Sequence, residues 1–246
     1  MVSSQWLCRG VVLLTLVLFA GCNDGPAPQP KPKVPAGNGV IRGTVSFRGE
    51  RPAERKIPNS ACHAGAELAP DETVVVDEGG GLRNVLVYLK DGPNADVPPA
   101  ASPTVLDQVN CRYVPRVVAV RVGETLRLRS SDPTMHNVHG LAEKNAAFNV
   151  GMTAASQTKD MTFAAPEVFR VKCDVHPWMV AHVGVFDHPF HAVSGGGGSF
   201  ELTRVPPGTY TLVAWHEKYG EAAQQVTVTE GAPPATAAFT FPAAKG

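Results

Sequence analysis

The segment from Cys173 to Met179, which reads Cys-Asp-Val-His-Pro-Trp-Met, constrains the fold of this 246-residue chain more than any other segment. It places a thiol, an imidazole and a thioether at positions 173, 176 and 179. Three extended residues span roughly 10 Å, which is too far for neighbouring side chains of this set to meet at one metal ion. The segment must therefore turn tightly, and Pro177 suits such a turn because its ring already fixes φ.

The residues on either side of this segment predict strands. Apolar residues alternate with charged residues from Phe169 to Asp174, which is the period-two pattern of a half-buried strand. Cys173 falls on the apolar face at the end of that strand. Val183 and Val185 then indicate a returning strand. The sequence therefore predicts a strand, a short loop that carries the three donors, and a second strand.

A further imidazole donor is available upstream, in the segment from Asp132 to Gly140, which contains His136 and His139. Alternating apolar residues before this segment, from Val118 to Leu128, predict a hairpin that enters a β-sandwich. Residues three apart on a strand point to opposite faces, so His136 and His139 cannot both reach one ion. We therefore expect one ligand from this segment.

The three donor types together favour copper. Two imidazoles and one thiolate in a plane, with a weak axial thioether, are the ligands of a blue copper centre. A zinc site is the sharper alternative, because Cys173, His176 and His136 could hold zinc with one more ligand. The thioether of Met179 argues against zinc, which prefers thiolate, imidazole or carboxylate. In the plainest alternative, Cys173 is a small buried side chain and binds no metal.

Residues 108–187 resemble a cupredoxin, and the motif Cys173-x2-His176-Pro177-Trp178-Met179 is similar to the short ligand loop of amicyanin. The resemblance implies one type 1 copper. The histidine that precedes Asn137 is the one that corresponds to the family's ligand, which selects His136 over His139. The resemblance also implies that Asn137 ties the two ligand segments together by hydrogen bonds. The implied copper ligands are His136, Cys173, His176 and Met179, and the implied neighbours of the ligands are Asn137, Pro177 and Trp178.

The C-terminal region resembles the second half of a carboxypeptidase regulatory-like (transthyretin-like) β-sandwich, through a Gly-x-Phe strand and the turn Pro206-Pro207-Gly208-Thr209-Tyr210. An alternating segment from Ile41 to Phe47 and another from 84 to 89 are similar to its first half. We therefore expect an all-β chain that combines a cupredoxin Greek-key β-sandwich with a second immunoglobulin/transthyretin-like β-sandwich. Because the two halves of the regulatory-like sandwich lie on either side of the cupredoxin segment, the pattern favours insertion of the cupredoxin domain into that sandwich. A tandem arrangement of the two domains is the alternative.

The expected division of the chain follows from these resemblances and from its N-terminus. An apolar run from Val11 to Ala20, followed by Gly21 and Cys22, resembles a bacterial lipobox, which implies cleavage before Cys22 and lipidation of its thiol. Plain secretion is the alternative. The expected regions are a lipoprotein signal peptide (1–21), a Pro-rich tether (22–38), the first half of the regulatory-like sandwich (39–95), the cupredoxin domain (96–187) and the second half of the sandwich (188–246).

These features predict that the protein is a lipoprotein of the bacterial cell envelope. It would face the periplasm or the cell surface and contact the membrane only through its lipid anchor. The residue after Cys22 is asparagine rather than aspartate, which favours the outer over the inner membrane. In that oxidising environment we expect the remaining cysteines, Cys62 and Cys111, to form a disulfide. A free pair is the alternative, since a sequence cannot show that two Cα atoms lie close enough.

The function that these observations predict is one-electron transfer through Cu(II) and Cu(I), with a cytochrome or a periplasmic dehydrogenase as redox partner. The 22 basic and 22 acidic residues balance, so nothing indicates nucleic-acid binding. We expect no enzyme, because the chain has no His-x-His pair for a multicopper oxidase and no common hydrolase or phosphate-binding motif.

The alternative function is a non-redox copper- or zinc-binding adhesion lipoprotein whose sandwich binds protein or carbohydrate. A second metal site built from His182, His188 and His191 also stays open at this point.

Overall fold

The structure is a computed structural model that describes residues 31–57, 70–153 and 155–242. The predicted signal peptide, Cys22 with its predicted lipid, the first part of the predicted tether and Cys62 lie outside the described residues and stay predictions.

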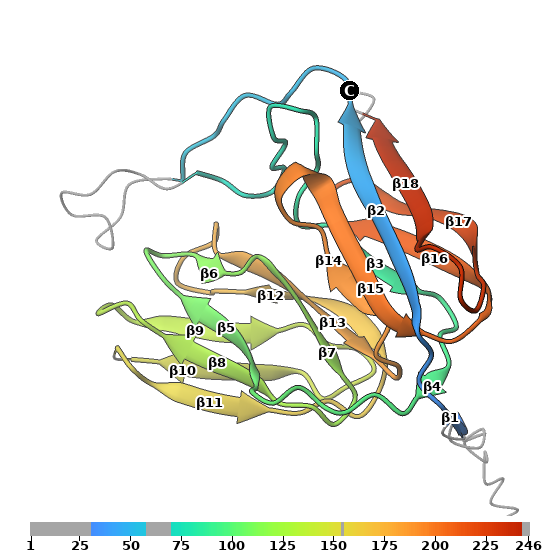
Figure 1. Ribbon diagram of the computed structural model, residues 1–246. Helices are drawn as coiled ribbons and strands as arrows, with labels where there is room; N and C mark the ends of the chain where they lie inside the picture. Colours follow the sequence, from blue (N-terminus) through green and yellow to red (C-terminus); the bar gives the residue numbers. More distant parts are fainter. Residues whose placement is uncertain (1–30, 58–69, 154, 243–246) are drawn as a thin grey trace, which may run out of the picture. The chain divides into compact units, whose positions relative to one another are not determined.

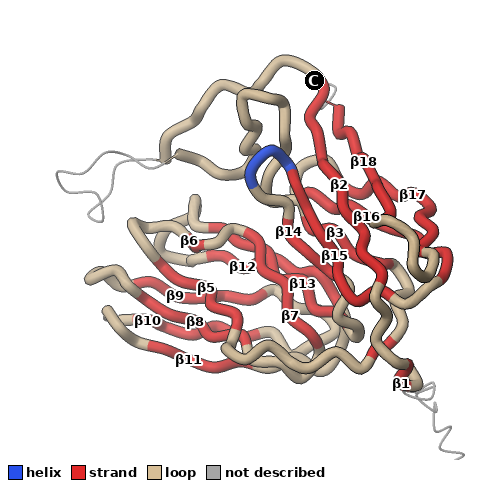
Figure 2. Tube along the Cα trace, in the orientation of Figure 1, coloured by secondary structure: helices blue, strands red, loops and turns tan. Residues whose placement is uncertain are grey.

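The all-β prediction is confirmed. Among the described residues the helical structure is limited to one 3-10 turn, η2 (Gly196–Gly198), which appears in blue in Figure 2 between red strands. No helix within the described ranges is long and apolar enough to cross a membrane. All other regular structure consists of strands.

Residues 104–186 form two facing sheets. The five-stranded sheet has the order β10 (Phe148–Met152), β9 (His136–Gly140), β12 (Glu167–Lys172), β13 (Val180–Phe186) and β7 (Val117–Arg121). The four-stranded sheet has the order β11 (Thr158–Met161), β8 (Leu126–Ser130), β5 (Thr104–Gln108) and β6 (Tyr113–Val114). One buried cluster takes side chains from both sheets, such as Leu106 and Leu128 from one and Val171 and Val183 from the other. The two sheets therefore enclose a common core, as in a β-sandwich.

The remaining strands form a second pair of sheets. One has the order β14 (His191–Val193), β3 (Leu86–Leu89), β16 (Gly208–His216) and β17 (Gly220–Val228), and the other has the order β15 (Ser199–Val205), β2 (Gly39–Arg48) and β18 (Ala235–Pro242). Two short strands, β1 (Lys33–Val34) and β4 (Asn94–Ala95), pair in parallel. The apolar faces of the two larger sheets share a second buried cluster that includes Ile41, Val87, Leu212 and Phe239.

Strands from both ends of the chain share these two sheets. Figure 1 shows β2 in blue between β15 in orange and β18 in red, and the pairing of β2 with both strands is regular over most of its length. In the other sheet β3 lies between β14 and β16. Pairing of this kind is what an inserted domain would require. Whether 39–95 with 188–246 and 96–187 are separate folding units stays a prediction.

Candidate metal centre

The turn predicted between Cys173 and Met179 is present. The backbone N–H of Cys173 donates to the carbonyl of Met179 (3.1 Å), and the N–H of Met179 donates to the carbonyl of His176 (2.9 Å). The segment begins directly after β12, so Cys173 continues the inward face of that strand. The side chains of Cys173, His176 and Met179 are all buried.

His136 meets this turn from the neighbouring strand. It is the first residue of β9, which pairs with β12 through Val171 opposite Gly140 and Lys172 opposite His139. Continuing this antiparallel register places the start of β9 beside the turn. The Nδ1 atoms of His136 and His176 lie 2.9 Å apart, and their rings meet edge-on with centroids 4.7 Å apart. Two imidazole nitrogens thus converge on one point.

Cys173 adds a sulfur to this pair. It is the free cysteine among the described residues, and its Sγ lies 3.8 Å from Nδ1 of His176. Burial would raise the pKa of the thiol, but the hydrogen bond with the His136 side chain and the bonds from nearby backbone N–H groups lower it below the ordinary value. The site therefore favours the thiolate, which is the form that binds metals.

Asp132, which no sequence motif singled out, orients His136. Its carboxylate lies 2.9 Å from Nε2 of His136 and also accepts the backbone N–H groups of Asn110 and Cys111. Burial alone would lower the pKa of His136, but the hydrogen bonds with Asp132 and Cys173 outweigh it and raise the pKa to about 9. Because the carboxylate holds a proton on Nε2, Nδ1 is the nitrogen that can give up its proton and bind a metal. The available signal was an acid four residues before the ligand histidine.

Asn137 connects the two ligand segments. Its Oδ1 accepts the backbone N–H of Asp174 (2.7 Å) and lies 3.2 Å from Sγ of Cys173. Its Nδ2 donates to the Asp174 carboxylate (2.8 Å) and to Oδ1 of Asn149 (2.7 Å). The hydroxyl of Tyr113 donates to the Asn137 carbonyl. These bonds hold the start of β9 against the end of β12.

His139 lies outside the cluster of donors. Its Nδ1 is 3.0 Å from the Asp174 carboxylate, at a partly exposed position. His136, three residues earlier on the same strand, is fully buried. The two histidines therefore have the different environments that the period-two argument predicts.

Apolar residues flank His176 and His136 in the sequence, and we call the exposed ones the apolar rim. The Trp178 ring lies 5.3 Å from the His176 ring, and its Nε1 donates to the carbonyl of Cys111 (3.1 Å). Pro177 is exposed. Met135 and Val175, which precede the two histidines in sequence, are 53% and 50% exposed. His176 itself is 9% exposed, the largest exposed fraction among the four predicted ligands.

A second sulfur lies at the same place, and the sequence analysis did not predict it there. The Sγ of Cys111 and one ring nitrogen each of His136 and His176 all lie within 4.8 Å of one another. Within the described part of the chain this is the one group of three or more His, Cys, Asp or Glu residues whose ligand atoms lie that close together, and the predicted ligand Cys173 is not one of its members. Cys111 is disulfide-bonded, so in this state its sulfur is not a thiolate. The pairing with Cys62 stays a prediction.

His182, His188 and His191 form no such group. Both ring nitrogens of His188 are engaged, with the Leu89 carbonyl (2.8 Å) and with the backbone N–H of Phe190 (3.1 Å). His182 packs edge-on against Trp215 and His191 stacks on Phe186, with centroids 5.1 and 4.9 Å apart. These histidines are packed among aromatic rings in the described structure and do not converge on one point.

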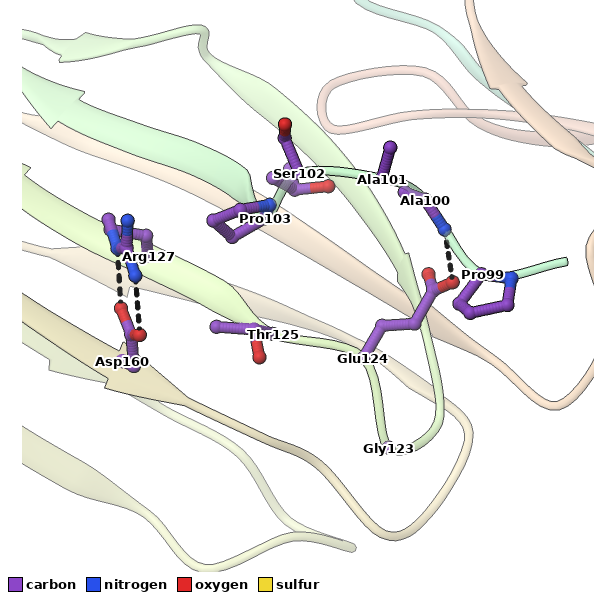
Figure 3. Close-up of a pocket in the computed structure, with 11 residues that line it drawn as sticks. Pro99, Ala100, Ala101, Ser102, Pro103, Gly123, Glu124, Thr125, Arg127 and Asp160 are labelled. Atoms are coloured by element: carbon purple, nitrogen blue, oxygen red, sulfur yellow. Dashed lines mark hydrogen bonds and ion pairs between the residues drawn. The ribbon is translucent and has the colours of Figure 1, made fainter.

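The hollow shown in Figure 3 lies away from this centre. It has a volume of about 320 Å³, between Pro99–Thr104 and the Gly123 turn. Thr104 and Gln108 stand at opposite ends of β5, roughly 13 Å apart, and Gln108 Nε2 contacts the Asn137 carbonyl beside the donors. The charged groups that line the hollow are paired: Arg127 binds Asp160 at 2.7 Å, and Glu124 accepts the backbone N–H of Ala100. It offers no candidate chemistry.

The donor set fits copper. The imidazole of His136 on β9, the imidazole of His176 and the Cys173 sulfur, which favours the thiolate, lie close together at the buried turn. Met179 closes that turn, and its side chain is buried in the same core. Thiolate, imidazole and thioether together are the donors that copper prefers in proteins.

Comparison with known proteins gives partial matches. Residues 190–236 match the family described as polysaccharide lyase family 4, domain II. No curated protein matches the chain. A Cu-containing nitrite reductase (NirK) from Thermus scotoductus SA-01 is 19% identical over 36% of this chain and 25% of its own, with a TM-score of 0.33. The chain thus spans about a quarter of that reductase.

Two smaller proteins match over nearly their whole length. A mutant of amicyanin in the Cu(I) form is 25% identical over 40% of this chain and 97% of its own, with a TM-score of 0.32. A purple cupredoxin from Nitrosopumilus maritimus is 20% identical over 33% of this chain and 98% of its own, with a TM-score of 0.30. The chain is thus similar to cupredoxins over 33–40% of its length.

Proposed function

We propose that His136, Cys173, His176 and Met179 bind one type 1 copper ion and that the protein transfers single electrons. The observation that carries the proposal is the convergence of two Nδ1 atoms 2.9 Å apart with the free Cys173 sulfur 3.8 Å from one of them. When bound, copper would supply a Cu(II)/Cu(I) couple whose thiolate ligand gives intense visible absorption.

The chain's own residues would keep this centre rigid. Asp132 holds the His136 ring by its Nε2, and Asn137 ties the Cys173 sulfur and the Asp174 backbone to β9. The backbone bonds of the turn hold Met179 in place. A site whose ligands are held before metal binds changes little between two oxidation states, which favours fast electron transfer. Four protein donors would also leave no position for a substrate, so the proposal includes no catalysis.

His176 offers the exit for the electron. It is the most exposed of the four proposed donors, its sequence neighbours Val175 and Pro177 are exposed, and so is Met135, which precedes His136. A small apolar rim suits a weak and transient partner, because such encounters bury little surface. A cytochrome or a periplasmic dehydrogenase is the kind of partner that we propose.

The remaining parts of the proposal rest on sequence resemblance. Lipidation of Cys22 would anchor the chain to a bacterial envelope membrane, the outer one in preference to the inner one. Strands from 39–95 and 188–246 would form the carboxypeptidase regulatory-like sandwich, which would present the copper domain to its partner.

The test is the absorption and EPR spectrum of the Cu(II)-loaded protein. An intense visible band and a narrow copper hyperfine splitting are expected. Cys173→Ser should abolish the band, because a hydroxyl is a harder ligand than a thiolate. His139→Gln is the matched control, since His139 contacts Asp174 rather than the donors, and it should keep the band. A colourless wild-type protein that retains zinc through purification would overturn the proposal.

A further inference from the structure

Both the backbone and the sulfur of Cys111 lie at the candidate metal centre. Its N–H donates to the carboxylate of Asp132 (2.9 Å), which also holds His136, and its carbonyl accepts Nε1–H of Trp178 (3.1 Å). The residue is fully buried and has φ of 51°. A left-handed conformation is unfavourable for a residue with a side chain, so these contacts hold Cys111 where it is.

The Cys111 sulfur lies beside the ring nitrogens of two predicted metal ligands. The Cys111 sulfur, with one ring nitrogen each of His136 and His176, fits within a span of 4.8 Å. Those are the two histidines proposed as copper ligands, and Cys173 lies 3.8 Å from one of them. Reduction of the Cys111 disulfide would therefore place a second thiol among the same donors.

We propose that Cys111 is a latent metal ligand, released when its disulfide is reduced, and that the reduced centre is a site for zinc. This inference rests on the proposed copper centre, whose two histidines it shares. The disulfide takes two electrons and two protons from a dithiol protein, whose own thiols become a disulfide, and yields two thiols. Zinc binding then displaces the proton of the Cys111 thiol.

The reduced centre would offer two thiolates and two imidazoles. A tetrahedral set of two sulfurs and two nitrogens is a structural zinc site, whereas one thiolate with an axial thioether favours copper. The disulfide would thus decide which metal the two histidines hold. Oxidation keeps Cys111 out of the donor set, and reduction adds it.

The test uses the full chain with Cys8→Ser and Cys22→Ser, so that three cysteines remain. Cobalt(II) is the probe, because a thiolate bound to it gives a charge-transfer band. Cys173→Ser is added so that a band can report only on Cys62 or Cys111. Reduction uses a water-soluble phosphine, which takes oxygen from water and becomes the phosphine oxide, and which is removed before cobalt is added. A thiol assay confirms the reduction.

The Cys173→Ser protein should show no thiolate band while oxidised and a clear band after reduction. With Cys62→Ser added, Cys111 should be a thiol from the start and the band should appear without reductant. With Cys111→Ser instead, no band should appear in either state. These two variants are a matched pair, since each removes one of the two cysteines predicted to form the bridge. Circular dichroism checks that each variant is folded.

Zinc affinity gives a second readout in the protein that keeps Cys173. Loss of an outer contact to a metal ligand already costs about tenfold or more in affinity, so gain of a direct thiolate should tighten zinc binding by at least about tenfold on reduction. Two thiols in the reduced Cys173→Ser protein without a cobalt band would overturn the inference. So would a band that survives Cys111→Ser. A colourless Cu(II) protein with Cys173 intact would instead count against the proposed copper centre alone.

Discussion

Arg116 and Glu217, two residues 101 positions apart in the chain, form an ion pair through two hydrogen bonds. Nη2 of Arg116 donates to Oε2 of Glu217 (2.9 Å) and its Nε donates to Oε1. The side chains are 8% and 12% exposed, and the guanidinium also donates to Oγ1 of Thr73 (3.1 Å). The pair joins the residue before β7 to the residue after β16. Beside it, Leu86, Val117 and Phe186 pack in a cluster of their own.

Removal of one member of this pair should destabilise the protein. Glu217→Ala leaves a buried guanidinium without its carboxylate, and we expect the free energy of unfolding to fall by about 3–5 kcal/mol. Replacing both residues with apolar ones, as Arg116→Met with Glu217→Leu, should recover most of the loss. Urea denaturation measures both. Asp96→Ala, which breaks the exposed pair with Lys33, is the control and should cost about 1 kcal/mol or less.

Asn137→Ala should loosen the ligand turn. The variant removes the acceptor of the Asp174 N–H and the contact with the Cys173 sulfur, so we expect a loss of about 1–3 kcal/mol in unfolding free energy. Asn149→Ala is the control, because Asn149 donates to the same Asp174 carboxylate at an exposed position (2.9 Å). Equal stability losses in the two variants would show that Asn137 has no special role.

Met179→Leu should keep the blue colour of the copper-loaded protein and raise its reduction potential. Loss of a weak axial donor destabilises Cu(II) more than Cu(I). The swap nearly conserves volume, so the unfolding free energy should change by less than about 1.5 kcal/mol. Protein-film voltammetry measures the potential. Met161→Leu, in β11, should leave the potential unchanged, and an equal shift in both variants would argue against Met179 as a ligand.

Stability should fall in mild acid through buried neutral histidines. Burial lowers the pKa of His182, His188, His191 and His216 to about 4, against 6.5 in the unfolded chain. Between these values the unfolded chain binds protons that the folded protein does not, so the stability that these four histidines contribute is fully present above pH 6.5 and is lost as the pH falls toward 4. Each group corresponds to roughly 3 kcal/mol at most.

Denaturation midpoints at pH 7.5, 5.5 and 4.5 test this prediction on the metal-free protein. His182→Phe should reduce the dependence on pH while keeping a ring against Trp215. The charged groups that act on His182 are Glu217, Arg116 and Arg170, and all are present in both proteins. An unchanged slope in the variant would contradict the assignment of this histidine.

Excision should separate two folding units if the chain contains an inserted domain. Residues 96–187 alone should fold and turn blue with copper. Residues 39–92 joined to 188–246 through a short Gly/Ser linker should give a stable colourless sandwich, because β2 pairs with β15 and β18 and β3 pairs with β14 and β16. Both products lose the Arg116–Glu217 pair, so lower stability than in the full chain is expected. Folding of 188–246 by itself would contradict the insertion.

Local patterns were sufficient for the strand that leads into the ligand turn and for the turn itself. The alternation from Phe169 to Asp174 predicted a strand that ends at the cysteine, and β12 ends at Lys172. The need for donors to converge predicted the turn that Met179 closes. Both inferences use residues within about ten positions of one another, where backbone geometry limits the possibilities strongly.

The parts that the sequence did not reveal depend on distant pairing. The Cys111 sulfur reaches His136 and His176 only because the loop that follows β5 folds back onto Asp132. No pattern around Cys111 reports that approach. Asp132 was missed for a related reason, since a carboxylate before a proline usually begins a turn, and only the folded strand directs it at an imidazole. The contact of Arg116 with Glu217 is likewise visible only once the strands are placed.

Two of the hydrogen bonds that hold the ligand turn join main-chain atoms only. The bonds from the Cys173 N–H to the Met179 carbonyl and from the Met179 N–H to the His176 carbonyl involve no side chain. The backbone frame is therefore independent of which donors it carries. Substitutions at positions 173, 176 and 179 can therefore replace one metal ligand with another without breaking these two backbone hydrogen bonds. Related proteins could change their metal by point mutation while the strands on either side stay the same.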